Sequence, residues 1–133
     1  MQRLIAGLFL AVLSASLHAQ TMDLRATIPF AFRAGETVMP AGEYTIRHSA
    51  NNLVLHKEGG GPSVLLLTNG ASRPNLPAHA QLDFNRYGER YFLSSVWTQG
   101  SQAGFEIPKG RAEKEVARQT APREFAEIAL RRK

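Results

Sequence analysis

The sequence of 133 residues contains no cysteine. This absence excludes a disulfide-linked fold, thiolate metal sites, a cysteine nucleophile and lipid attachment through a thiol. Aspartate is also scarce, because Asp23 and Asp83 are the two in the whole sequence. There is no Gly-x-Ser-x-Gly motif, which forms the sharp turn that exposes the nucleophilic serine in α/β-hydrolases. We therefore expect a protein that is not an enzyme and needs no cofactor.

Long hydrophobic runs are missing after the first twenty residues. At the start, Arg3 precedes an apolar run at 4–13, and a small and polar stretch ends at Ala19. This order is typical of a secretory signal peptide over residues 1–19. The run is too short for a membrane span, which needs about 20 apolar residues. We expect an exported chain, periplasmic or extracellular, that begins at Gln20 and has no transmembrane segment.

The formal charge of +5 is unevenly distributed. Residues 20–108 hold seven basic and seven acidic side chains, whereas residues 109–133 hold eight basic and four acidic ones. The main part of the chain therefore offers no basic face that would indicate nucleic-acid binding. If any part contacts an anionic envelope surface, we expect it to be the basic tail; a solvated end that binds nothing is the favoured alternative. The residues in question are Arg131, Arg132 and Lys133.

Hydrophobic residues alternate with polar ones through most of residues 20–108. The clearest example is 24–34, where every even position is apolar, as expected for a strand with one buried face. Further strand-like segments occur at 43–48, 53–57, 63–68, 79–87, 90–98 and 105–107, and of these 63–68 is a short continuous apolar run. Glycine, proline and asparagine turns separate them. About seven strands at this spacing predict an all-β domain, either an antiparallel sandwich or a small barrel. We expect its interior to be filled by the large side chains of Ile28, Phe30, Phe32, Phe84, Phe92 and Trp97 and not to be hollow.

The C-terminal segment 109–133 differs in composition and predicts an α-helical tail. Residues 111–119 contain helix formers and no glycine or proline. A second helix is predicted over 122–131, with Phe125, Ile128 and Ala129 on one side and Glu127 paired with Arg131. The chain therefore divides into a signal peptide (1–19), a β-domain (20–108) and a basic helical segment (109–133).

Several linked motifs are similar to those of a family of small exported bacterial β-rich proteins. They are IPFAF at 28–32, PAGEY at 40–44, FNRYGERYFLS at 84–94 and IPKGRAEKE at 107–115. The resemblance covers most of the chain to about Arg118 and implies export and a compact β-rich domain. It carries over no activity and no site residues. The family has serine where this chain has Gly110, and serine would be the better helix cap.

Histidines give no sign of a metal site. A two-residue turn at 51–52 would place His48 opposite Leu55 and His56 opposite Arg47, on opposite faces of the sheet. A register shift of one residue would bring the two histidines to one face. His79 and Asp83 share a predicted strand face but lie about 13 Å apart along it. The sequence therefore predicts no metal ligands.

The hairpin at 86–92 is the best candidate for a binding surface, because arginines alternate with aromatic residues that could stack on sugars or on a peptide. The candidate residues are Arg86, Tyr87, Arg90 and Trp97. In the competing interpretation, Tyr91, Leu93 and Trp97 share one strand face and fill the core.

These patterns favour a non-catalytic binding or structural module of the cell envelope. A first alternative is a carrier that holds an apolar ligand inside a small barrel. A weaker alternative is a hydrolase of envelope polymers that uses Asp83, Glu89 or Glu106 as its carboxylates.

Overall fold

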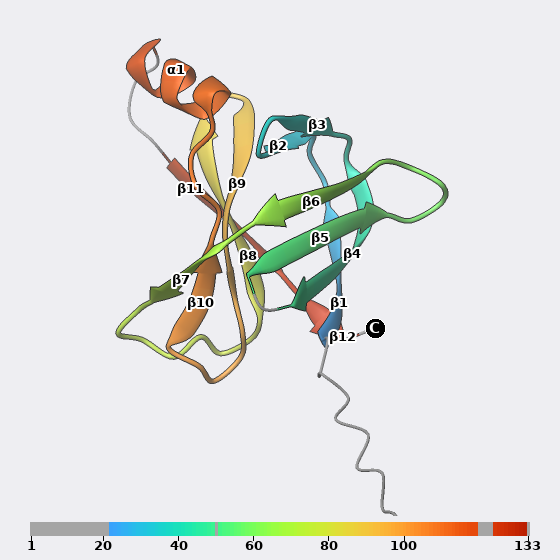
Figure 1. The fold of residues 1–133 in the computed structure, drawn as a ribbon, viewed down its shortest axis with the longest axis vertical. Coiled ribbons are helices and arrows are strands. Elements are labelled where there is room, and N and C mark those ends of the chain that lie inside the picture. The colour runs from blue at the N-terminus through green and yellow to red at the C-terminus, as the bar shows by residue number, and fades with distance from the viewer. Residues whose placement is uncertain (1–21, 50, 120–123, 133) are drawn as a thin grey trace, which may run out of the picture.

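The computed structural model describes residues 22–49, 51–119 and 124–132, which form two packed β-sheets and one helix (Figure 1). The first sheet has the order β12-β1-β4-β5-β6, with bounds Arg131–Arg132, Met22–Ile28, Gly42–Ser49, Asn52–Lys57 and Ser63–Leu67. The second sheet has the order β11-β8-β9-β10-β7, with bounds Glu124–Ala129, Gln81–Tyr87, Arg90–Trp97, Ala103–Glu106 and Asn69–Ser72. A hairpin of β2 (Phe32–Ala34) and β3 (Thr37–Met39) joins the second sheet where Arg33 pairs with Phe92.

The core lies between the two sheets, as the alternating pattern predicts. Ile46 and Leu55 face inward from the first sheet, and Phe84 and Leu93 face inward from the second; all four belong to one buried cluster. The described residues form two separate sheets and not a closed barrel. The sandwich prediction is therefore confirmed, and the barrel alternative is wrong. Without a closed barrel, the alternative of a carrier that holds its ligand inside a barrel has no interior to hold it.

The strands are more numerous and shorter than the seven expected. Pro29 separates β1 from β2, since proline cannot donate a hydrogen bond to a neighbouring strand. Residues 69–72, which follow the predicted strand at 63–68, form a further strand, β7, which pairs with β10. The described residues contain twelve β-segments, several of two to four residues.

The helix predicted over residues 111–119 is confirmed as α1 (Arg111–Gln119). The second helix predicted over 122–131 is wrong, because Glu124–Ala129 forms strand β11. Ala126 and Ile128 pair with Phe84 and Leu82 on β8 and pack against the core, whereas Phe125 is 66% exposed. Glu127 pairs with Asp83 across the strands, so the helical Glu127–Arg131 pair does not form. Sheet pairing and burial here outweigh a helical preference that is intrinsically weak.

A β-bulge in β9 decides which side chains face the core. Asp83 pairs with Ser95 but Phe84 pairs with Leu93, so Ser94 is an extra residue. Leu93 and Val96 consequently both face the core, and Trp97 lies on the opposite face of the second sheet, which we call the outer face. The prediction that Tyr91, Leu93 and Trp97 share one face is wrong for Trp97.

The predicted signal peptide, residues 1–19, lies outside the described residues. Within the described part, no helix combines the length and the apolar character needed to cross a membrane.

Candidate functional site

Helix α1 covers one end of the outer face of the second sheet. Val116 packs on Tyr87 and Phe92 there. Glu113, only 5% exposed, accepts hydrogen bonds from the Asn85 side-chain amide and the Tyr87 hydroxyl, both at 2.9 Å. A buried carboxylate is tolerated when hydrogen bonds satisfy it. These two bonds therefore fix the helix on the sheet.

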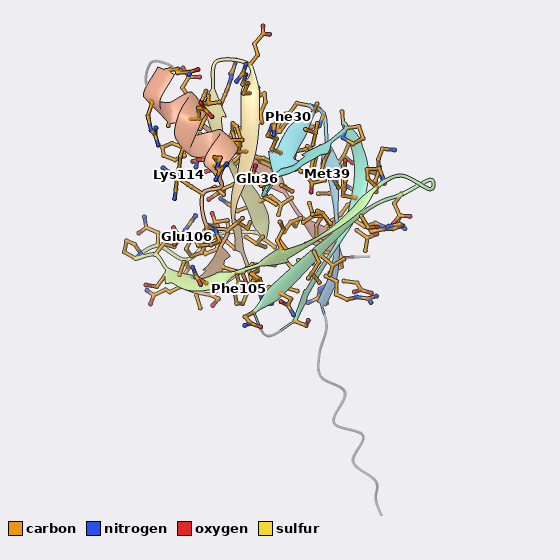
Figure 2. All side chains as sticks on the ribbon, turned by 45° about the horizontal axis from the view of Figure 1, so that its top comes forward. Phe30, Glu36, Met39, Phe105, Glu106 and Lys114 are labelled. Atoms are coloured by element: carbon orange, nitrogen blue, oxygen red, sulfur yellow. The ribbon has the colours of Figure 1, made fainter. Side chains whose placement is uncertain are left out.

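The N-terminus of α1 is capped from a distant part of the chain. The Arg111 backbone N–H donates to Glu36 Oε1 at 2.7 Å, and Glu36 lies in the turn between β2 and β3. A Cβ atom on Gly110 would lie 2.3 Å from that oxygen, so glycine leaves room for the Glu36 carboxylate. An acidic group at this position also suits the positive end of the helix dipole. Figure 2 shows Glu36 close to the start of the helix.

A cleft of about 540 Å³ lies between α1, the β2–β3 hairpin and the β8–β9 turn. Its apolar lining includes the buried side chains of Phe32, Phe92 and Val116 and the largely exposed Val38. Because Glu36 links the β2–β3 turn to α1, one hydrogen bond connects two walls of the cleft.

Four charged side chains also line the cleft: Arg33, Glu89, Arg90 and Glu115. Arg33 is half-buried, whereas the other three are exposed. Within residues 22–49, 51–119 and 124–132, Arg33 makes no ion pair. The least solvated charge of the cleft is therefore positive.

Trp97 belongs to a separate polar cluster at the other end of the outer face. The Arg73 guanidinium lies 3.7 Å from the centroid of the Trp97 ring and pairs with Asp83 at 2.6 Å. The indole N–H donates to Ser95 Oγ at 2.9 Å. A Cβ atom on Gly104 would lie 2.4 Å from the ring, so glycine is needed where Trp97 crosses β10. The tryptophan is 5% exposed and offers no stacking surface.

The four hairpin candidates thus occupy four different places. Arg90 lines the cleft, and Tyr87 is buried beneath α1. Arg86 donates to the Gly88 carbonyl at 2.7 Å and lies 3.7 Å from Glu124. The structure therefore does not bring Arg86, Tyr87, Arg90 and Trp97 into one binding surface.

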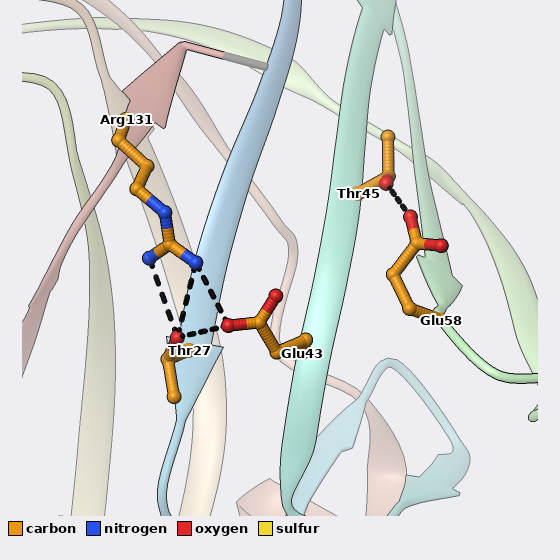
Figure 3. Close-up of polar contacts among 5 residues, drawn as sticks. All are labelled: Thr27, Glu43, Thr45, Glu58 and Arg131. Carbon is orange, nitrogen blue, oxygen red and sulfur yellow. Dashed lines mark hydrogen bonds and ion pairs between the residues drawn. The ribbon is translucent and has the colours of Figure 1, made fainter.

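The basic tail is partly engaged within the fold. Arg131 donates to Glu43 at 2.8 Å and to Thr27 at 3.3 Å (Figure 3). The hydrogen bond from Thr27, together with the Arg131 charge, lowers the pKa of the Glu43 carboxyl. Arg132 is exposed on β12, and Lys133 lies outside the described residues. Of the three cations considered for an anionic surface, Arg131 is thus already paired.

The three hydrolase carboxylates do not form one group. Asp83 and Glu106 both lie opposite Ser95, from β8 and β10, while Glu89 lies at the turn before β9. Asp83 accepts hydrogen bonds from Arg73 and from Gln81, at 2.6 and 2.7 Å.

The histidines are separated as well. His48 lies opposite Leu53 and His56 opposite Thr45, a register two residues from the predicted one. A shift of two keeps each side chain on its face, so His48 points inward and His56 outward. His79 lies before β8 and is exposed. No group of three or more potential metal ligands occurs among the described residues.

Sequence reasoning missed Arg33, Glu36 and Glu113. Arg33 occupies a polar position in an alternating strand, and its position in the cleft depends on the parallel pair with Phe92. Glu113 was counted with the solvated charges of a basic tail. The sequence signal that could have revealed it is its position three residues before Val116, on the apolar side of α1.

The fold and the cleft together define a two-sheet β-sandwich with a small-ligand-sized cleft under its helix. In comparisons with known proteins, no family model, no curated protein and no solved structure matches this chain.

Proposed function

We propose that this protein is an exported, non-catalytic binding module of the cell envelope whose ligand occupies the cleft under α1. The observation that carries this proposal is a cleft of about 540 Å³ in which buried apolar side chains lie beside charged ones. Small-molecule sites measure about 300–1,000 Å³ and combine apolar walls with a few polar groups. The signal-peptide pattern of residues 1–19 supports export.

The ligand we propose is a small amphipathic anion. Its apolar part would pack on Phe32, Phe92 and Val116. Its anionic end would face Arg33, because a half-buried guanidinium gains more from a charged partner than one exposed to water does. Glu89 and Glu115 are exposed, where water screens their repulsion.

This proposal transfers the carrier alternative from a barrel interior to an open cleft. The space between the sheets is occupied by a packed core that includes Phe32, Tyr44 and Phe84. The hydrolase alternative is less well supported, because Asp83 is held by Arg73 and Gln81. Turnover of ester, glycoside or peptide libraries by the purified protein would overturn the non-catalytic proposal.

Displacement of the fluorescent amphipathic anion anilinonaphthalene sulfonate by decanoate tests the cleft. We expect decanoate to compete better than decanol, and Arg33→Gln to weaken decanoate binding about tenfold while leaving decanol unchanged. Arg118→Gln is the matched control, since Arg118 is exposed on α1 but does not line this cleft. No displacement, or an equal effect of both substitutions, would contradict the proposal.

A further inference from the structure

Strand β6 forms an open edge of the first sheet. One of its sides pairs with β5, and no strand of the described residues pairs with the other (Figure 1). Leu65 and Leu67 are 63% and 68% exposed on this strand. An edge strand usually carries a charge, a proline or a bulge that prevents pairing with another chain. β6 has none of these, so its edge is open to a further strand.

The hydrogen bonds to β5 show which backbone groups of β6 point to the open edge. The Thr68 N–H donates to the Asn51 carbonyl at 2.8 Å at one end of this pairing. The Lys57 N–H donates to the Pro62 carbonyl at 3.1 Å at the other end. Because bonded and non-bonded pairs alternate in an antiparallel ladder, every second residue between these ends turns its N–H and C=O away from β5. These residues are Ser63, Leu65 and Leu67, and no backbone partner for them occurs within the described part of the chain.

The chain around β6 carries no charge that would oppose pairing with a second copy. Residues 59–72 contain no aspartate, glutamate, lysine, arginine or histidine. In a two-fold arrangement each residue near the axis lies close to its own copy, so a charge there would face a like charge. The edge strands β11 and β12 do carry charges, at Glu124, Glu127, Arg131 and Arg132. β6 therefore suits a copy of itself better than a charged partner strand.

We propose that two copies of this chain pair through β6 in the antiparallel direction, with the two-fold axis at Leu65. Leu65 then forms a hydrogen-bonded pair with Leu65 of the second copy, and Ser63 pairs with Leu67 of the second copy. Each pair exchanges two hydrogen bonds. The Leu65 side chains meet beside Val54, their neighbour on β5, and the two first sheets become one continuous sheet. The inference does not depend on the cleft, since no residue of β6 lines it.

Light scattering after size-exclusion chromatography of the full chain tests the proposal. A pairing of two short strands is small, so we expect a micromolar Kd and a rise from monomer to dimer mass between about 1 µM and about 100 µM. Leu65→Lys places like charges across the axis and should weaken dimerisation at least about tenfold. Monomer mass at about 100 µM, or self-association that Leu65→Lys leaves unchanged, would overturn the proposal.

Leu76→Lys is the matched control. Leu76 is 60% exposed, as Leu65 nearly is, but it lies between β7 and β8 and outside β6. This substitution introduces the same charge and should leave the dimer unchanged. Both leucines are exposed, so both variants should fold.

The absence of cysteine allows a second measurement that also tests the register. Bonded antiparallel pairs have Cα atoms about 5.5 Å apart, within reach of a disulfide. In air, Leu65→Cys should therefore cross-link with itself, whereas Ser63→Cys and Leu67→Cys should cross-link mainly when mixed. Leu76→Cys is the control for random collision. Cross-linking of Leu65→Cys no faster than that of Leu76→Cys would contradict the proposed pairing.

Discussion

Glu113 is the residue on which the position of α1 depends most. Its carboxylate is buried and accepts hydrogen bonds from Asn85 and Tyr87. Glu113→Ala leaves both of these donors buried without their acceptor, and hydrogen bonds to charged groups contribute about 1.5–3 kcal/mol each. We expect the free energy of unfolding to fall by about 2–4 kcal/mol, measured by urea denaturation.

The neighbouring Glu115 provides the control for that measurement. It lies on the same helix and is exposed, so Glu115→Ala should change the free energy of unfolding by about 0.5 kcal/mol or less. Equal effects of the two substitutions would show that the Glu113 carboxylate does not anchor the helix.

His48 is expected to make stability depend on pH. Burial lowers the pKa of this imidazole below its ordinary value of 6.5, and no hydrogen bond reaches Nε2 from the described residues. Its ring stacks on Phe105 of the opposite sheet, with centroids 3.4 Å apart. Below pH 6.5 the unfolded chain therefore binds more protons at this residue than the folded chain does.

The stabilising contribution of neutral His48 is thus complete above pH 6.5 and is lost as the pH falls through the folded-state pKa. Between about pH 7.5 and about pH 5.5, the wild type should lose more free energy of unfolding than His48→Gln does. Equal losses in the two proteins would refute this origin of the pH dependence.

At this scale, the sequence predicted side-chain positions well where strands are regular and poorly at the bulge. The alternation in 24–34 correctly placed Leu24, Ala26 and Ile28 in the core. The extra residue Ser94 moved Trp97 to the outer face, and nothing in the alternation marks that insertion. The candidate surface failed for a different reason, because packing on the outer face buries both Trp97 and Tyr87.

At the scale of elements, strand β11 shows how tertiary pairing outweighs local preference. Residues 122–131 contain alanine, glutamate, leucine and arginine, which favour a helix. The same segment also alternates, with Ala126, Ile128 and Leu130 directed to the core. Both periods fit so short a segment, and only the unpaired edge of β8 decides between them. The sequence of this segment alone therefore does not decide between a helix and a strand.

The strand assignment predicts opposite effects at two positions of this segment. Leu130 is 7% exposed in the core, so Leu130→Ala should cost about 2–4 kcal/mol in the free energy of unfolding. Phe125 is 66% exposed, and Phe125→Ala should cost about 1 kcal/mol or less. Thermal and urea denaturation of both variants provide the measurement. A larger loss at Phe125 would favour the helical arrangement, in which Phe125 faces the protein.

The contact between Glu36 and α1 is a second testable link between elements. Glu36→Ala removes the acceptor of the Arg111 N–H, and loss of a helix cap typically costs about 1 kcal/mol. Because this bond also links two walls of the cleft, decanoate affinity should fall with it. Thr37→Ala is the control, since Thr37 is exposed one residue away. Unchanged stability and affinity in Glu36→Ala would show that the cap contributes nothing.

At the scale of the whole molecule, the sheets are joined by the chain as well as by the core. The chain passes from β6 in the first sheet to β7 in the second at Thr68, and returns from β11 to β12 at Leu130. Leu130 is itself part of the core cluster, and its N–H donates to the Ala80 carbonyl at 2.8 Å. Neither sheet can therefore separate without breaking contacts made by the other, and we expect the two to unfold together.

One probe in each sheet tests this expectation, and the lack of cysteine makes the design simple. Trp97, the single tryptophan of the chain, reports on the second sheet by its fluorescence. Leu65 is 63% exposed on β6, so Leu65→Cys gives a unique labelling site on the first sheet. The urea midpoints from tryptophan fluorescence and from the label should coincide, as in a two-state transition. Circular dichroism of the unlabelled Leu65→Cys variant controls for any effect of the substitution. A label that reports unfolding at clearly lower urea would mean that the first sheet opens while the second remains folded.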